Sequence, residues 1–155
     1  MKDYNVAVGA GSRLPISRKH VREVLNMIKG MNLDKAIERL ELVKSFKRAV
    51  PFKRYKKDMG HKRGMSAGRY PIKACDHIIK LLFNAKNNAV NQGLQEEKLY
   101  VHEAITMMNI SKNKRIRARK GPFIKSAKSL SIRIKVKEKE EVEKKKKTLK
   151  EVKKK

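Results

Sequence analysis

The chain has 155 residues and a net charge of +27, because its 42 Lys and Arg far outnumber its 15 Asp and Glu. The length suits one domain with one core, no apolar run approaches the roughly 20 residues of a transmembrane helix, and we expect no signal peptide. Such a charge opposes compaction and calls for an acidic partner. The basic residues lie in expected loops rather than on one amphipathic helix, which favours nucleic acid over a membrane as that partner.

The N-terminal residues predict a short edge strand followed by a turn. Apolar residues alternate from Tyr4 to Val8, which is the period of a half-buried strand. Gly9, Gly11 and Pro15 then follow, and these residue types interrupt regular structure. We therefore expect the strand to end near Gly9.

Two helices are predicted next. Apolar residues recur at helical spacing from Val21 to Ile28, Ser17 is a suitable N-cap, and Gly30 occupies the position of a C′ glycine. A second apolar stripe runs from Leu33 to Val43, with Asn32 as its expected cap. Because only a tight turn separates the helices, we expect them to pack as a pair.

Residues 45–69 differ from the rest of this half of the chain. They contain nine Lys and Arg, several glycines and the aromatic residues Phe46, Phe52 and Tyr55, without a clear period. A loop this long inside a compact domain is usually functional or disordered. Arginine can bind phosphates through two hydrogen bonds and aromatic rings can stack on bases, so this loop is a candidate RNA contact.

The segment from Pro71 to Gly93 predicts the central helix. Its apolar stripe includes Cys75 and runs to Ala89. The single cysteine excludes an internal disulfide and fits an intracellular, reducing setting. Cys75 and His77 would lie on different helix faces, which argues against a metal pair, and we interpret Cys75 as a small core residue.

Residues 99–137 predict a long β-hairpin. Leu130, Ile132, Ile134 and Val136 alternate with polar residues, and we expect Met107 and Met108 to fill gaps between sheet and helix. No carboxylate occurs from Ala104 to Lys137. An isolated two-stranded arm of like charges is marginal in water, so a polyanion is expected around it. Residues 138–155 are rich in Lys and Glu and predict a charged tail, or at most a frayed helix.

Signals for catalysis are weak. The sequence holds no phosphate-binding glycine motif, metal-protease motif or paired carboxylates, and its histidines are scattered. We therefore predict that the chain is not an enzyme and has no cofactor or metal. Two alternatives are a free protein that compacts DNA or RNA, and an RNA-processing enzyme, which would need an acid–base pair or a metal cluster.

Three segments resemble the archaeal and eukaryotic branch of the large-subunit ribosomal protein L22 family. They are GHKRG at 60–64, GRYPIKA at 68–74 and LFNAKNNA at 82–89. The resemblance implies an α+β fold, with three helices packed on a small antiparallel sheet and a long extended hairpin. It covers about residues 4–137. Residues 1–137 would form a single RNA-binding domain with the basic loop 45–69 and the hairpin arm about 99–137.

The resemblance also implies a structural role in the cytoplasmic large ribosomal subunit. The partners would be large-subunit rRNA, neighbouring ribosomal proteins and the nascent polypeptide, with no membrane. The family's Arg-Ala-x-Gly-Arg tip is replaced here by RARKGP at 117–122. The residues expected to bind rRNA are Arg18, Lys19, Lys53, Arg54, Lys56, Lys57, His61, Lys62, Arg63, Arg69, Lys112, Lys114, Arg115, Arg117, Arg119, Lys120, Lys125 and Lys128. Those expected nearest the exit tunnel are Arg115, Arg117, Arg119 and Lys120.

Overall fold

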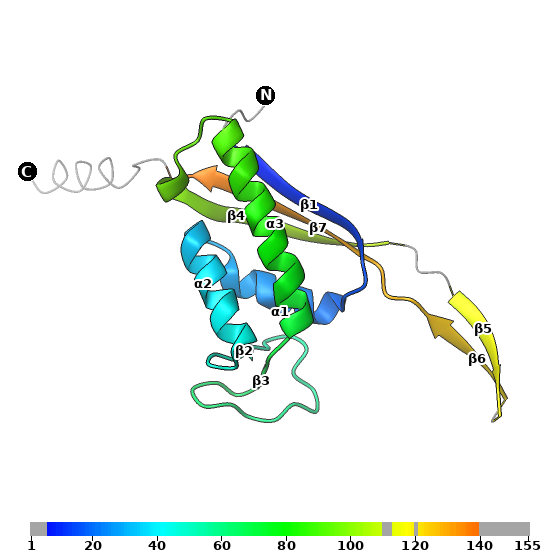
Figure 1. Ribbon diagram of the computed structural model, residues 1–155. Helices are drawn as coiled ribbons and strands as arrows, with labels where there is room; N and C mark the ends of the chain where they lie inside the picture. The colour runs from blue at the N-terminus through cyan, green and yellow to red at the C-terminus, as the bar shows by residue number, and fades with distance from the viewer. Residues whose placement is uncertain (1–5, 110–112, 120, 140–155) are drawn as a thin grey trace, which may run out of the picture.

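The computed structural model describes residues 6–109, 113–119 and 121–139. Their elements in chain order are β1 (Val6–Leu14), α1 (Arg18–Ile28), α2 (Leu33–Lys44), β2 (Val50–Pro51), β3 (Gly68–Arg69), α3 (Ile72–Asn91), the short 3₁₀ helix η1 (Glu96–Lys98), β4 (Leu99–Met108), β5 (Asn113–Ala118), β6 (Gly121–Ser126) and β7 (Leu130–Glu138). Helices α1, α2 and α3 lie on one side of the sheet formed by β1, β7 and β4, and an arm projects from one end of that sheet (Figure 1). The predicted α+β class, with three helices on a small antiparallel sheet, is confirmed.

Strand β7 is the centre of the three-stranded sheet. It pairs antiparallel with β1 on one edge and with β4 on the other. Its apolar residues Leu130, Ile132, Ile134 and Val136 are all buried, as the alternation predicts, because successive side chains on a strand point to opposite faces. The buried face of the sheet is therefore centred on this strand, with Ala7 of β1 and Leu99 and Val101 of β4 beside it.

The edge strand β1 is longer than predicted, since it runs through both glycines to Leu14. The reason is the helix that covers it. A Cβ atom on Gly9 would lie 2.3 Å from the carbonyl oxygen of Leu81 and 2.9 Å from Cβ of Ala85, so a side chain at this position is incompatible with the seated α3. Gly9 allows close contact between strand and helix. Tyr4, the first residue of the predicted strand, lies outside the described residues.

The two N-terminal helices have the predicted bounds but not the predicted packing. Gly30 follows α1 with a positive φ of 81°, and the apolar stripe of α2 is buried. Ser17 and Asn32 occupy the N-cap positions, yet neither side chain makes a capping hydrogen bond. The main packing partner of α2 is α3, whereas α1 packs against β4, β2 and α3. The tight turn thus joins two helices that pack mainly against other elements rather than against each other.

The predicted hairpin consists of two consecutive ladders. The first joins β4 to β7 within the sheet, and the second joins β5 to β6 in the projecting arm, from Asn113↔Ser126 to Ala118↔Gly121. Gly121 pairs with Ala118 at the end of the arm ladder and has a positive φ of 108°. Met107 and Met108 are 59% and 65% exposed, so the expectation that they fill core gaps is wrong. Met107 pairs with Ser131 on the polar face of the sheet, and Met108 is the last residue of β4.

The close contact at Gly9 leads to a stability prediction. Gly9→Ala should lower the free energy of unfolding by about 1–3 kcal/mol, because the new methyl group pushes α3 off β1. Gly60→Ala is the matched control, since a Cβ at Gly60 would meet no atom within 4 Å. Denaturant unfolding of the RNA-free protein measures both. Equal stability of the two variants would show that α3 can shift at no cost.

Candidate nucleic-acid interface

The basic loop, residues 45–69, is closed at its base by a small sheet. Strands β2 and β3 pair Val50 with Arg69 and Pro51 with Gly68, and the amide of Phe52 donates a hydrogen bond of 2.9 Å to the carbonyl oxygen of Ala67. Phe52 is only 2% exposed and belongs to the core. The expectation that its ring could stack on RNA bases is therefore wrong. The ring instead anchors the loop to the folded head.

A buried carboxylate holds the start of the loop in place. Glu23 of α1 is 1% exposed and accepts hydrogen bonds from the backbone amides of Lys53 at 3.2 Å and Arg54 at 3.0 Å. Burying a charged group is costly unless such bonds compensate it. The side chains of Lys53 and Arg54 are exposed, while the carboxylate of Glu23 holds their backbone amides. Glu23 is thus a positioning residue for the cationic surface.

The sequence pattern does not indicate the role of Glu23. It lies on the side of α1 opposite the apolar stripe from Val21 to Ile28, so the helical period predicts exposure to solvent. The loop covers it from a position 30 residues further along the chain. The one available signal was that Glu23 is the only carboxylate between Asp3 and Asp34.

The predicted contact residues on the head are all exposed. They are Arg18, Lys19, Lys53, Arg54, Lys56, Lys57, His61, Lys62, Arg63 and Arg69. The ring of Tyr55 joins two segments of this surface, with Lys19 Nζ of α1 5.8 Å from its centroid and the Arg54 guanidinium 5.9 Å from it. Lys62 lies 5.6 Å from the ring centre of Tyr70. Cation–π contacts of this kind bring the charges of α1 and the loop onto one surface.

The arm carries the second set of predicted residues. Arg115, Arg117 and Arg119 are exposed along β5 and its turn, and Lys128 is exposed just before β7. Lys114 and Lys125 belong to the paired strands, and Arg117 faces Pro122 in the ladder. Lys112 and Lys120 lie outside the described residues. The structure brings the head residues together, whereas the arm residues form a separate surface.

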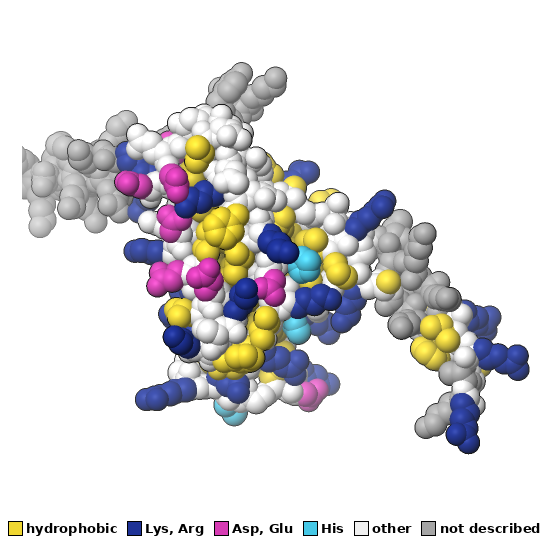
Figure 2. Space-filling view, viewed as in Figure 1, with side chains coloured by type: hydrophobic (Ala, Val, Ile, Leu, Met, Phe, Trp, Pro, Cys, Tyr) yellow, Lys and Arg dark blue, Asp and Glu magenta, His cyan; other side chains and the backbone are white. Residues whose placement is uncertain are grey.

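Within the described residues, the ion pairs lie away from both surfaces. Lys44 pairs with Asp76 at 2.6 Å, Lys86 with Asp34 at 2.8 Å and with Glu96, and Lys135 with Glu103 at 2.8 Å. These bonds raise the pKa of Lys44 and Lys86 and lower the pKa of Glu103. Figure 2 shows carboxylates gathered over the helices, whereas Lys and Arg dominate the loop end and the arm. Asp58 is the one carboxylate within the basic loop, and the described part of the arm contains none, so the two basic surfaces have almost no counter-ions of their own.

The structure gives no catalytic constellation in the part that it describes. Residues 6–109, 113–119 and 121–139 contain no group of three or more His, Cys, Asp or Glu that could hold a metal ion. Cys75 is buried in the core, as predicted, and burial raises the pKa of its thiol to about 11, which keeps it protonated and unreactive. Of the helices in these ranges, none is long and apolar enough to cross a membrane.

Comparison with known proteins agrees with these features. The family "Ribosomal protein L22p/L17e" matches residues 10–137, which is most of the chain. The chain belongs to this family. The L22p/L17e match includes the head, the basic loop and the arm, and membership in a family of structural ribosomal proteins confirms that the chain is not an enzyme.

Archaeal members of the family are similar to this chain. "Large ribosomal subunit protein uL22" of Methanocaldococcus jannaschii is 46% identical over 104 residues, which cover 65% of this chain and 67% of that protein. The protein of the same name from Methanococcus aeolicus is 49% identical over 94 residues, covering 59% of this chain and 61% of its own length. That of Methanococcoides burtonii is 43% identical over 115 residues, covering 73% and 76%. The predicted archaeal-type branch is thus confirmed.

The buried carboxylate gives a prediction about the loop. Glu23→Ala should lower the free energy of unfolding by about 1–3 kcal/mol, because two buried amides lose their acceptor. The amides of Lys53 and Arg54 should exchange hydrogen faster than in the parent chain, as measured by mass spectrometry or NMR. Glu38→Ala, at an exposed carboxylate of α2, should leave both amides protected. Unchanged exchange in the Glu23 variant would contradict a positioning role.

His20 gives a prediction about pH. Burial, followed by the positive charges of Arg69 and Lys128, lowers its pKa from the ordinary value of 6.5. As pH falls, the unfolded chain takes up this proton first, so the free energy of unfolding should decrease as pH drops through 6.5 and below. Denaturant unfolding at several pH values measures this decrease. His20→Gln should reduce the dependence, and His61→Gln, on the exposed loop, should retain it.

Proposed function

We propose that this chain is a structural constituent of the cytoplasmic large ribosomal subunit and binds large-subunit rRNA. In this proposal residues 1–137 act as a single RNA-binding domain, with residues 138–155 as a charged tail. The observation that carries the proposal is the pair of exposed cationic surfaces, one on the loop and one on the arm, in which Asp58 is the single carboxylate among the described residues. Phosphates of folded RNA supply the missing negative charge.

The arm supports this proposal by its construction. Strands β5 and β6 form a ribbon of two strands with six residues each, which spans about 20 Å at ~3.3 Å per residue. A ribbon of this kind has no core of its own, and Phe123 and Ile124 are exposed on it. Packed RNA would provide both the counter-charge and the cover for these side chains.

The proposed orientation of the arm is toward the exit tunnel for the nascent polypeptide. The tip, with Arg117 and Arg119 exposed beside the Ala118↔Gly121 pair, would lie at the tunnel wall and Lys120 with it. These cations would hold rRNA and set the charge that an emerging chain meets. The helical side of the head, where the carboxylates gather, would face neighbouring ribosomal proteins.

The arm can be tested through the salt dependence of RNA binding. Replacing Arg115, Arg117, Arg119 and Lys120 together by Ala should weaken binding to a large-subunit rRNA fragment. The slope of log affinity against log salt concentration should fall by about 3, because fewer counter-ions are released. Filter binding at several salt concentrations gives both quantities.

A matched variant removes the same charge elsewhere. Lys35, Lys80, Lys98 and Lys139 are exposed and lie outside the two basic surfaces, so their joint replacement by Ala should change the slope less. Equal slopes for the two quadruple variants would contradict a specific role for the arm. Co-sedimentation with the large subunit after a moderate salt wash separates a ribosomal role from general nucleic-acid compaction, because only a ribosomal protein should remain bound.

A further inference from the structure

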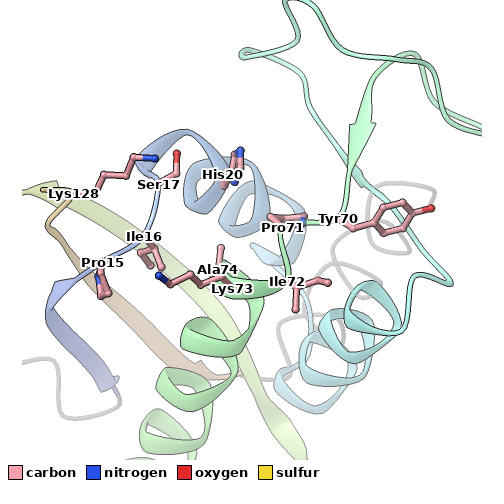
Figure 3. A pocket seen from close by; sticks show the side chains of 10 residues that line it. All are labelled: Pro15, Ile16, Ser17, His20, Tyr70, Pro71, Ile72, Lys73, Ala74 and Lys128. Carbon is pink, nitrogen blue, oxygen red and sulfur yellow. The ribbon is translucent and has the colours of Figure 1, made fainter. Parts of the chain in front are cut away.

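A cavity lies where the first turns of α1 and α3 meet the base of the arm. It has a volume of about 400 Å³. Figure 3 shows Ser17 and His20 at the start of α1, Lys73 at the start of α3, and Lys128 on the chain that enters β7. Three segments that are far apart in the sequence therefore form one site. Of its basic residues, only Lys128 was expected to bind RNA.

The polar lining of the cavity is positive. Lys73 extends from α3 toward Ile16, and Lys128 extends from the arm toward Ser17 (Figure 3). Lys128 and Arg69 both act on the imidazole of His20, whose ring is held edge-on against Phe52 with centroids 5.7 Å apart. All ten lining residues lie in the described part of the chain, and none is Asp or Glu. The side chain of Ser17 makes no capping hydrogen bond to α1.

Most of the remaining lining is apolar. Pro15, Ile16, Pro71, Ile72 and Ala74 provide these surfaces, and Tyr70 completes the lining. A small inorganic anion would use the lysines but would leave these surfaces wet, and about 400 Å³ is within the range of roughly 300–1,000 Å³ that holds a small organic ligand. The combination of cations with an apolar wall fits a molecule that has both a phosphate and a flat or apolar body.

We infer that this cavity accepts one unstacked nucleotide of the bound RNA, with its phosphate beside Lys73 and Lys128 and its base or ribose against Pro15 and Ile72. The inference rests on the proposed RNA-binding function. RNA is chosen over an acidic peptide because the cavity lies between the two basic surfaces: Arg69 of the loop is close enough to act on His20, and Lys128 belongs to the arm. Proteins commonly recognise RNA through single nucleotides that leave the stack.

The test uses the full chain and adenosine 5′-monophosphate, followed by NMR. The nucleotide should shift the ring signals of His20 and the methyl signals of Ile16 and Ile72, and it should raise the pKa of His20, because a nearby phosphate favours the imidazolium form. Inorganic phosphate should affect His20 but leave the methyl signals nearly unchanged. Adenosine alone should bind more weakly than the monophosphate.

Two lysine variants and a control complete the test. Lys73→Ala and Lys128→Ala should each weaken monophosphate binding by about fivefold, because each removes a charge-assisted hydrogen bond. Lys80→Ala removes an exposed charge from the same helix as Lys73, outside the cavity, and should leave binding unchanged. Both cavity lysines are exposed, so the variants should fold, and the unchanged remaining signals of their spectra would verify this.

Several outcomes would overturn the inference. These are a monophosphate that shifts no cavity signal, equal binding by all three lysine variants, and an acidic peptide that shifts the same signals as strongly as the nucleotide. Methyl shifts by inorganic phosphate as large as those by the nucleotide would reduce the site to a simple anion site. These results do not depend on rRNA binding, because the probe is a free nucleotide. A failure to bind rRNA would instead contradict the proposed function.

Discussion

The seating of helix α3 on the sheet is the contact on which the rest of the structure depends. At Gly9 the strand β1 lies so close to Leu81 and Ala85 that no side chain fits between them. This contact fixes α3 over β1 and β7, and α2 and α1 then pack against α3. The start of α3 also forms one wall of the cavity beside the arm. A shift of this helix would therefore disturb both the core and the proposed RNA surface.

Charge is distributed unevenly over this fold, and that distribution suits a partner rather than a free protein. The carboxylates pair with lysines on the helices and on the outer face of the sheet. Glu23 differs from these paired carboxylates, since it is buried and binds the backbone of the loop instead of a cation. The buried carboxylate of Glu23 thus holds the backbone of the cationic loop in place. The energy of mutual repulsion in that surface is lowered when phosphates bind.

Much of the fold could be predicted because local periodicity reflects burial directly. The alternation in β7 and the stripe of α3 identified their buried faces, since each is decided by one neighbouring layer. The errors occurred where distant segments decide exposure. Phe52 is buried because the loop closes through β2 and β3, and Met107 is exposed because its pairing with Ser131 places it on the polar face of the sheet. The length of β1 depended on whether a helix would lie against its glycines.

The sequence by itself determined the family of the protein and its basic character. Its family segments indicate a ribosomal protein, and its charge and carboxylate-free arm indicate an acidic partner, because composition and short motifs are properties of the chain alone. Only the tertiary structure decided which residues share a surface. It joined α1 to the loop through Glu23 and Tyr55 and brought Lys73 to the same cavity as Lys128. Such groupings depend on how helices and strands pack, and no local pattern records contacts between residues so far apart in the chain.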